Sequence, residues 1–199
     1  EFPDDWLGLG DVWLHTREDD AVEVRFGGTV HEWMDHGKFK AAQVGYQSVM
    51  AVPHDFYISG YHADAANKLT LWSATGPHGF DMAGLEQNAM AETISKVLYP
   101  ADDHIEGKRL RLKQQYLLVS ASLQTILKEH CKQYGTLTNL ADKVAVHIND
   151  THPALCVPEL MRLLVDQYEM GWDEAWEIAC KCLSYTNHTV MAEALERCE

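Results

Sequence analysis

The stretch Val144-Ala-Val-His-Ile-Asn-Asp-Thr-His-Pro153 predicts a strand that ends in a polar turn. Val144, Val146 and Ile148 alternate with smaller or polar residues, and β-branched side chains favour the pleated, half-buried surface of a sheet. The polar residues 149–152 come together just before Pro153, where a chain tends to stop pairing and to turn.

A helix is predicted directly after this turn, because apolar residues recur there at helical spacing on one face. These residues are Val157, Leu160, Met161, Leu164, Val165 and Tyr168. In α/β sheets, ligands bind at the carboxyl ends of the strands, just before the following helix. The sequence therefore puts an acid, an amide and an imidazole at a position that favours ligand binding.

Composition narrows the class of protein. The chain has 199 residues, 46% of them hydrophobic, and a net charge of −14. It can bury a sizeable core, and we expect a single domain over residues 1–199. No basic stripe is present, so nucleic acid is not an expected partner. No apolar run approaches the roughly 20 residues of a membrane helix. The five cysteines, an odd number without repeated spacing, predict reduced thiols in the cytoplasm.

The first third of the chain is predicted to be mostly strands. Lys38–Lys40 is placed in a polar turn, and the links are too short for helical crossovers, so the strands should be antiparallel. The alternating segments are Val22–Phe26 with Thr29–Trp33 as hairpin partner, Val44–Val52 ended by Pro53, and Leu69–Ala74.

Helices dominate the remainder. The first predicted helix is Leu85–Leu98, with Met90 and Ile94 facing inward, and the second is Gly107–Tyr134. A third helix is predicted to be capped by Asp173, with Trp176 facing inward, and to end in the polar segment Tyr185–Thr189. The predicted fold class is therefore α/β, with a mixed sheet: antiparallel strands first, then strand–helix units with packed helices. The chain lacks a starting Met and ends within a helix-like pattern, so we expect it to be an internal fragment.

Three polar clusters could carry chemistry, namely Asp102-Asp103-His104, Asn149-Asp150-Thr151-His152 and Asn187-His188. Taken singly, each cluster is explained as a loop or a helix cap. His147, Asp150 and His152 offer metal ligands, but His147 and His152 lie five residues apart, and residues of one strand share a face only at even spacing. No metal site is therefore predicted. The chain contains no GxSxG, P-loop or GxGxxG motif, which disfavours serine hydrolases and nucleotide-binding enzymes.

A series of blocks resembles the α-glucan phosphorylases, the family of the glycogen and maltodextrin phosphorylases. The resemblance runs in order along nearly the whole chain and is most specific from Val97 onward. The blocks are Val97-Leu-Tyr-Pro100, Glu106-Gly-Lys-Arg-Leu-Arg-Leu-Lys-Gln-Gln-Tyr116, His147-Ile-Asn-Asp-Thr-His-Pro153, Pro158-Glu-Leu-Met-Arg162, Gly171-Trp-Asp-Glu-Ala-Trp176, Tyr185-Thr-Asn-His-Thr189 and Glu193-Ala-Leu-Glu-Arg197.

The resemblance implies an activity and an architecture. The family uses orthophosphate to cleave the terminal α-1,4 bond of a glucan, releasing glucose 1-phosphate, and the phosphate of pyridoxal phosphate serves as acid/base catalyst. The site lies between two lobes of a glycosyltransferase-B-like enzyme, a cytoplasmic homodimer. This chain resembles the inner part of the N-terminal lobe, so the cofactor lysine and the C-terminal lobe lie outside it. No catalytic residue is expected within it, and the isolated piece should be inactive. The alternative is a stand-alone α-glucan-binding or assembly domain.

The resemblance also implies which residues bind the sugar. His188 matches the histidine that bonds the hydroxymethyl end of the glucosyl unit, and Asn187 beside it is included in the substrate-binding set. Asp150 and His152 match the acid and the imidazole that line the sugar channel.

Two further sets of residues follow from the resemblance. Asp102 and Asp103 fall in the loop that gates the channel, where the second position is typically Asn, so Asp103 is a departure. Arg111, Glu193 and Glu196 match the walls of a side pocket.

A last departure concerns regulation. The animal enzymes carry two adjacent arginines where a nucleotide phosphate binds, and the matching residues here are Lys128 and Glu129. One charge is inverted, so the fork that grips phosphate is absent. We expect an enzyme of the unregulated bacterial type.

Overall fold

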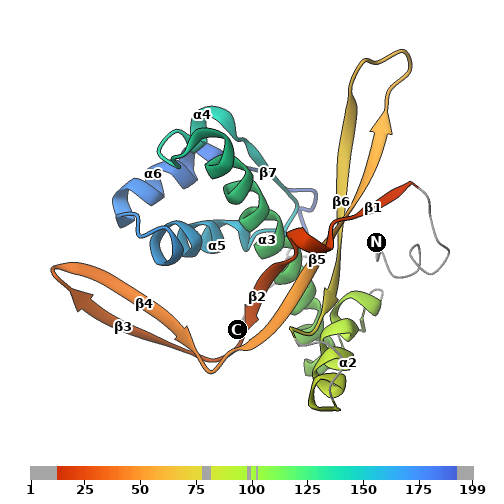
Figure 1. Ribbon diagram of the computed structural model, residues 1–199, viewed down its shortest axis with the longest axis horizontal. Coiled ribbons are helices and arrows are strands. Elements are labelled where there is room, and N and C mark those ends of the chain that lie inside the picture. The colour runs from red at the N-terminus through yellow and green to blue at the C-terminus, as the bar shows by residue number, and fades with distance from the viewer. Residues whose placement is uncertain (1–12, 78–81, 98–99, 102, 192–199) are drawn as a thin grey trace. The chain divides into compact units, whose positions relative to one another are not determined.

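The computed structural model describes residues 13–77, 82–97, 100–101 and 103–191 (Figure 1). The chain forms two compact units. The first unit comprises residues up to Gly28 together with Gly45–Leu117, and the second comprises Thr29–Val44 together with the residues from Leu118 onward. Each unit has its own sheets and its own core, and the α/β prediction with antiparallel strands in the first third is confirmed.

The first unit is built on one long strand. β5 (Gln47–Ser59) pairs along one edge with β6 (Ala66–Thr75). Its other edge pairs with β2 (Val22–Phe26) and with β1 (Leu14–Thr16), and all three pairings are antiparallel. A short 3-10 helix, η1 (Glu18–Asp20), connects β1 to β2. The predicted strands over 22–26 and 69–74 are thus confirmed.

The prediction that Pro53 ends its strand is wrong. β5 continues to Ser59, and Pro53 lies opposite Trp72 of β6. The reason is local, because β2 pairs only up to Ala51 and β1 pairs only from His54. The missing N–H of Pro53 falls at the gap between these strands, where η1 lies and no ladder bond is lost. The Pro53 carbonyl still accepts a hydrogen bond from the Arg17 amide at 3.0 Å.

The core of the first unit follows the alternation of β2. Val22, Val24 and Phe26 are buried, and the intervening residues are half-exposed. The helix α2 (Met82–Lys96) packs on β6 and buries Ala91 and Ile94. The prediction that Met90 faces inward is wrong, since its side chain is 55% exposed; the buried face lies one residue further along the helix.

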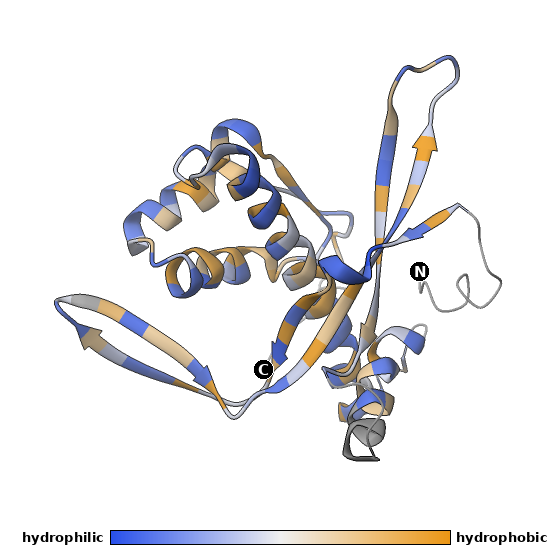
Figure 2. Ribbon diagram, in the orientation of Figure 1, coloured by the Kyte–Doolittle hydropathy of each residue, from blue (hydrophilic) through white to orange (hydrophobic). Residues whose placement is uncertain are grey.

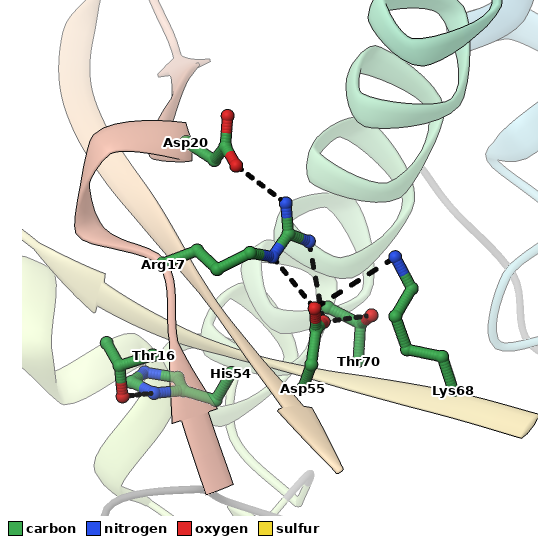
Figure 3. A network of polar contacts seen from close by, with 7 residues as sticks. All are labelled: Thr16, Arg17, Asp20, His54, Asp55, Lys68 and Thr70. Atoms are coloured by element: carbon green, nitrogen blue, oxygen red, sulfur yellow. Dashed lines mark hydrogen bonds and ion pairs between the residues drawn. The ribbon is translucent and has the colours of Figure 1, made fainter. Parts of the chain in front are cut away.

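A polar network joins the strands of this unit (Figure 3). The carboxylate of Asp55 on β5 is almost completely buried. Arg17 donates to it from Nε at 2.8 Å, Thr70 of β6 donates at 2.7 Å, and Lys68 lies 4.0 Å away. The same guanidinium donates from Nη1 to the exposed Asp20 at 2.8 Å. A charge that is taken out of water must be paired and hydrogen-bonded, and Asp55 satisfies both conditions.

Asp55 gives the first unit a pH-dependent stability. Burial by itself raises the pKa of this carboxyl, but the hydrogen bonds from Thr70 and Arg17 and the nearby charges outweigh burial and hold the pKa below its usual value. A depressed pKa in the folded state contributes stability above the unfolded-state pKa of about 3.9. That stability is lost as the pH falls through the lower folded value.

Asp55→Asn should therefore lower the melting temperature at pH 7, at a cost of about 3 kcal/mol, because it leaves Arg17 without its buried charged partner. The difference from the wild type should narrow as the pH falls below about 4, because the unfolded wild-type chain binds a proton at Asp55 there before the folded chain does. Thermal unfolding followed by circular dichroism across this pH range measures the effect. Asp20→Asn is the matched control, since it removes the exposed partner of the same arginine and should cost much less. A constant difference at every pH would contradict this account.

The second unit begins with a two-stranded hairpin of β3 (Thr29–Asp35) and β4 (Lys38–Val44). Two predictions were wrong here, because β3 does not pair with β2 and Lys38–Lys40 starts a strand. The turn is instead made by His36 and Gly37, both in the left-handed region at φ 48° and 79°, as two-residue hairpin turns require. Apolar residues recur along both strands (Figure 2). The side chains of Val30, Met34 and Phe39 are more than half exposed.

Helices form the body of the second unit. They are the C-terminal half of α3 (Ile105–Tyr134), α4 (Leu140–Lys143), α5 (Cys156–Arg162) with the π-helical turn η2 (Leu163–Gln167), and α6 (Trp172–Cys182). The helices predicted over 107–134 and after Pro153 are confirmed. The third helix is also present, but Gly171 stands at its N-cap instead of Asp173, and Trp176 is 48% exposed.

One apolar cluster holds these helices together. It is centred on residues of α3, α5, η2 and α6 that are at most 5% exposed, namely Leu123, Leu127, Leu160, Leu163, Leu164, Ile178 and Ala179. The buried Glu159 of α5 crosses to α3, where Ser120 donates to it at 2.6 Å, and Arg162 bonds the same carboxylate at 2.7 and 2.8 Å. The strand residue Ile148 is buried in the cluster, so the cluster fixes the strand that carries the polar turn.

Candidate functional site

Two short parallel strands form the base of the candidate site. β7 (Val146–Asn149) pairs with β8 (Leu183–Thr186) in register, from Val146 opposite Leu183 to Asn149 opposite Thr186. The sequence did not predict β8, which follows α6 without a loop. Because the strands are parallel, their carboxyl ends meet at one edge. The two polar segments after them, 150–152 and 187–189, therefore leave the sheet side by side.

The backbone of Asp150 connects the two strand ends. Its amide donates to the Thr186 carbonyl at 2.8 Å, which extends the ladder by one bond. Its φ of 69° lies in the left-handed region, which Asp tolerates better than most residues because its carboxylate can bond locally. Here Oδ1 accepts from the Thr151 amide at 2.8 Å. The half-buried Asp150 thus turns the chain out of the sheet and lifts Thr151 and His152 above its edge.

His188 reaches back to the end of β7. Its Nε2 bonds Oδ1 of Asn149, the last residue of that strand. Asn187 is engaged by its own loop, since its Nδ2 donates to the Thr189 carbonyl at 2.6 Å and its Oδ1 accepts from the Thr189 amide at 3.1 Å. Asn187 therefore shapes the loop that presents His188. Asn149, His152, Asn187 and His188 are all exposed.

His147 lies on the same pair of strands but has a different environment. Its ring sits between two hydroxyl groups of β8, with Nε2 2.7 Å from Oγ1 of Thr186 and Nδ1 3.0 Å from Oγ of Ser184. Both ring nitrogens are thus used by neighbouring side chains. Within the described parts of the chain, no cluster of three or more His, Cys, Asp or Glu side chains is arranged to hold a metal ion.

The other predicted site residues are not placed relative to this edge. Asp103 is exposed and Arg111 half-buried; both belong to the first unit. Asp102, Glu193 and Glu196 lie outside the described residues. The loop near Asp103 is anchored at its far end, because the amide of Gly107 donates to Nδ1 of His104 at 2.9 Å at the start of α3.

Lys128 and Glu129 are exposed near the end of α3. Glu129 lines an open hollow of about 360 Å³ together with His130, Tyr134 and Lys143. The ammonium of Lys143 lies 5.9 Å from the centre of the Tyr134 ring. The hollow therefore has a carboxylate in its wall where the resemblance expects a cation.

None of the helices in the described ranges has the length and hydropathy that crossing a membrane requires.

Comparison with known proteins identifies the family. The model of the carbohydrate phosphorylase family matches residues 1–199, so the chain belongs to this family. Relatives include glycogen phosphorylases of Bacillus subtilis, 47% identical, and of Chlamydia pneumoniae, 46% identical, and the muscle form of glycogen phosphorylase of Ovis aries, 44% identical. Each alignment covers 99% of this chain and 25% of the relative. The chain thus spans about a quarter of the length of the relatives it matches.

The left-handed backbone at Asp150 leads to a prediction about stability. An alanine in this region is strained by about 1–2 kcal/mol, whereas glycine adopts it freely. Asp150→Ala should therefore melt at a lower temperature than Asp150→Gly, the reverse of the order at an ordinary position, where glycine is the less stable residue. Thermal unfolding of the two purified variants measures this order. If the alanine variant were the more stable of the two, the turn would not require a positive φ.

Proposed function

We propose that the protein to which this chain belongs is an α-glucan phosphorylase, which cleaves terminal α-1,4-glucosidic bonds of glycogen or maltodextrin with orthophosphate and releases glucose 1-phosphate. The observation that supports the proposal is the carboxyl edge of β7 and β8. There the chain presents Asp150, His152 and His188, the residues that the resemblance to the family assigns to sugar contacts.

The chemistry of this edge suits a sugar. Glucosyl hydroxyls are both donors and acceptors, and carboxylate, amide and imidazole groups supply matching partners. His188 is presented by a loop that Asn187 locks, so its position is set before the sugar arrives. A site built to bond a hydroxyl discriminates against analogues that lack it. In this proposal, the chain binds and orients the glucosyl unit.

The cofactor and the second substrate are assigned elsewhere in the protein. The edge of β7 and β8 carries the acid Asp150 and, among its described residues, no arginine or lysine, so it does not fit an anionic phosphate. We therefore assign pyridoxal phosphate and orthophosphate to the lobe that lies outside this chain. There the cofactor phosphate supplies acid/base chemistry. We also propose that the full-length protein acts as a homodimer in the cytoplasm. In this proposal, residues 1–199 form one domain, the inner part of the N-terminal lobe.

The second candidate is a stand-alone α-glucan-binding or assembly domain. The observation that favours it is that the two polar segments proposed to contact the sugar, 150–152 and 187–189, follow paired strands within this chain. The two candidates differ in one assay. Release of glucose 1-phosphate from maltodextrin and orthophosphate by the full-length protein supports the enzyme. Glucan binding without release, with pyridoxal phosphate supplied, supports the binding domain and contradicts the proposal.

His188→Ala in the full-length protein should lower kcat/KM for phosphorolysis by about 2–3 kcal/mol, with most of the loss in kcat. The reason is that a hydrogen bond which strengthens as the glucosyl unit approaches the transition state acts on the rate constant and not only on affinity. Steady-state release of glucose 1-phosphate measures both parameters.

His147→Ala is the matched control for this experiment. It removes an imidazole from the same pair of strands, but one whose ring nitrogens contact only Ser184 and Thr186. Its kcat should stay within a few-fold of the wild type. Equal losses in the two variants would mean that His188 acts through the fold alone.

AMP should not activate the full-length protein. Glu129 brings a carboxylate to the wall of the hollow at the end of α3, and a carboxylate repels a phosphate group. The measurement is the initial rate of phosphorolysis with and without AMP. A clear rise in rate that disappears in Lys128→Ala would contradict this prediction.

A further inference from the structure

Asn149 was given no role by the resemblance, yet it is the partner of the histidine proposed to read the sugar. Oδ1 of Asn149 forms a hydrogen bond with Nε2 of His188, across the ends of two adjacent strands. An amide oxygen can only accept a hydrogen bond, so Nε2 of His188 must carry the hydrogen. In a neutral imidazole, the other ring nitrogen then carries none.

We propose that Asn149 is a positioning residue that holds His188 as the Nε2–H tautomer and leaves Nδ1 as a hydrogen-bond acceptor toward the substrate. The inference rests on the proposed function, in which the ligand is a glucosyl unit. It adds the direction of the contact: the site reads the hydroxymethyl group through the hydrogen of its hydroxyl, not through its oxygen.

The surrounding structure supports this assignment. Asn149 is fixed by its register opposite Thr186 and by the neighbouring Ile148, which is buried in the core of the second unit. On the other side, Asn187 holds the backbone of Thr189, which fixes the residues on both sides of His188. The two partners therefore meet without the ligand. Among the described residues, the hydrogen bond of the His188 ring is the one that Nε2 makes to Asn149.

The chemical consequence is a particular selectivity. A fluorine atom in place of the hydroxyl keeps the size and a weak acceptor but cannot donate a hydrogen bond. If Nδ1 accepts, the fluoro analogue should be as poor a substrate as the deoxy analogue, which has neither donor nor acceptor. If Nδ1 instead carried the hydrogen, the fluoro analogue should be the better of the two.

The experiment uses the full-length protein in the direction of glucan synthesis. Its donors are glucose 1-phosphate and the 6-deoxy and 6-deoxy-6-fluoro analogues, with maltodextrin as acceptor. Both analogues should lose on the order of 30-fold in kcat/KM, because each leaves the same acceptor unpaired. A fluoro analogue that stays within about 3-fold of glucose 1-phosphate would overturn the inference. Absence of turnover with glucose 1-phosphate itself would overturn the proposed function, and the inference with it.

Two variants separate positioning from a structural role. Asn149→Ala frees the tautomer, so kcat/KM for glucose 1-phosphate should fall about 10-fold while the deoxy analogue loses much less. Asn149→Asp keeps the shape and stabilises the doubly protonated ring, whose Nδ1 becomes a donor, so the fluoro analogue should now exceed the deoxy analogue. Equal losses for every donor in both variants would show that Asn149 only supports the fold, and would contradict the proposal.

The chain offers a matched control for these variants. Asn139 makes the same kind of contact elsewhere in the second unit, with its Oδ1 2.8 Å from Nε2 of the buried His130. Asn139→Asp should leave the ratio between the three donors unchanged. A shift of that ratio equal to the one in Asn149→Asp would mean that the selectivity responds to general destabilisation, and this outcome also counts against the proposal.

Discussion

The parallel pairing of β7 with β8 is the constraint on which the candidate site depends. Four residues on each side set the register, and the bond from the Asp150 amide to the Thr186 carbonyl extends it beyond the strands. A pair this short is not stable by itself. It persists because Ile148 of β7 and Cys182, the residue just before β8, are buried in the same apolar cluster. Packing of the helices is therefore what brings the two polar segments together.

The left-handed turn at Asp150 and the ordered loop at Asn187 both cost conformational free energy, which the packing of the helices helps to offset. A positive φ at a residue other than glycine costs about 1–2 kcal/mol, which must be offset by surrounding contacts. The Thr151 amide and the Thr186 carbonyl supply two of them. Local strain held at a strand end, beside exposed polar side chains, is a common property of ligand sites. It is consistent with the preorganised edge that we propose binds the sugar.

The sequence predicted those parts of the fold that local pattern determines. The alternation of β2, the long helix α3 and the strand–turn–helix around Pro153 were all visible as periodicity. The errors lie where tertiary context decides. Pro53 is tolerated because two partner strands leave a gap beside it, which a window of neighbouring residues does not encode. The β3–β4 hairpin turns at His36 and Gly37, both at positive φ, just before the Lys38–Lys40 segment that the pattern placed in a turn.

The candidate site shows the same division. Asp150, His152 and His188 were predicted as site residues because their motifs resemble those of a known family, whereas Asn149, inside one of the same motifs, was given no role. The role proposed for Asn149 depends on β8, a four-residue strand with no clear alternation of its own, which sets it beside a histidine 39 residues away in the chain. Likewise, the Arg17–Asp55 pair joins residues separated by 38 positions, which no local pattern could connect.

The most direct test of the central claim is a crystal structure of the full-length protein with a bound maltooligosaccharide. The account predicts that a glucosyl unit lies at the carboxyl edge of β7 and β8, with its hydroxymethyl oxygen within about 3 Å of Nδ1 of His188. The contact between Nε2 of His188 and Asn149 should be retained. A glucosyl unit bound elsewhere, with only water or protein at His188, would contradict it.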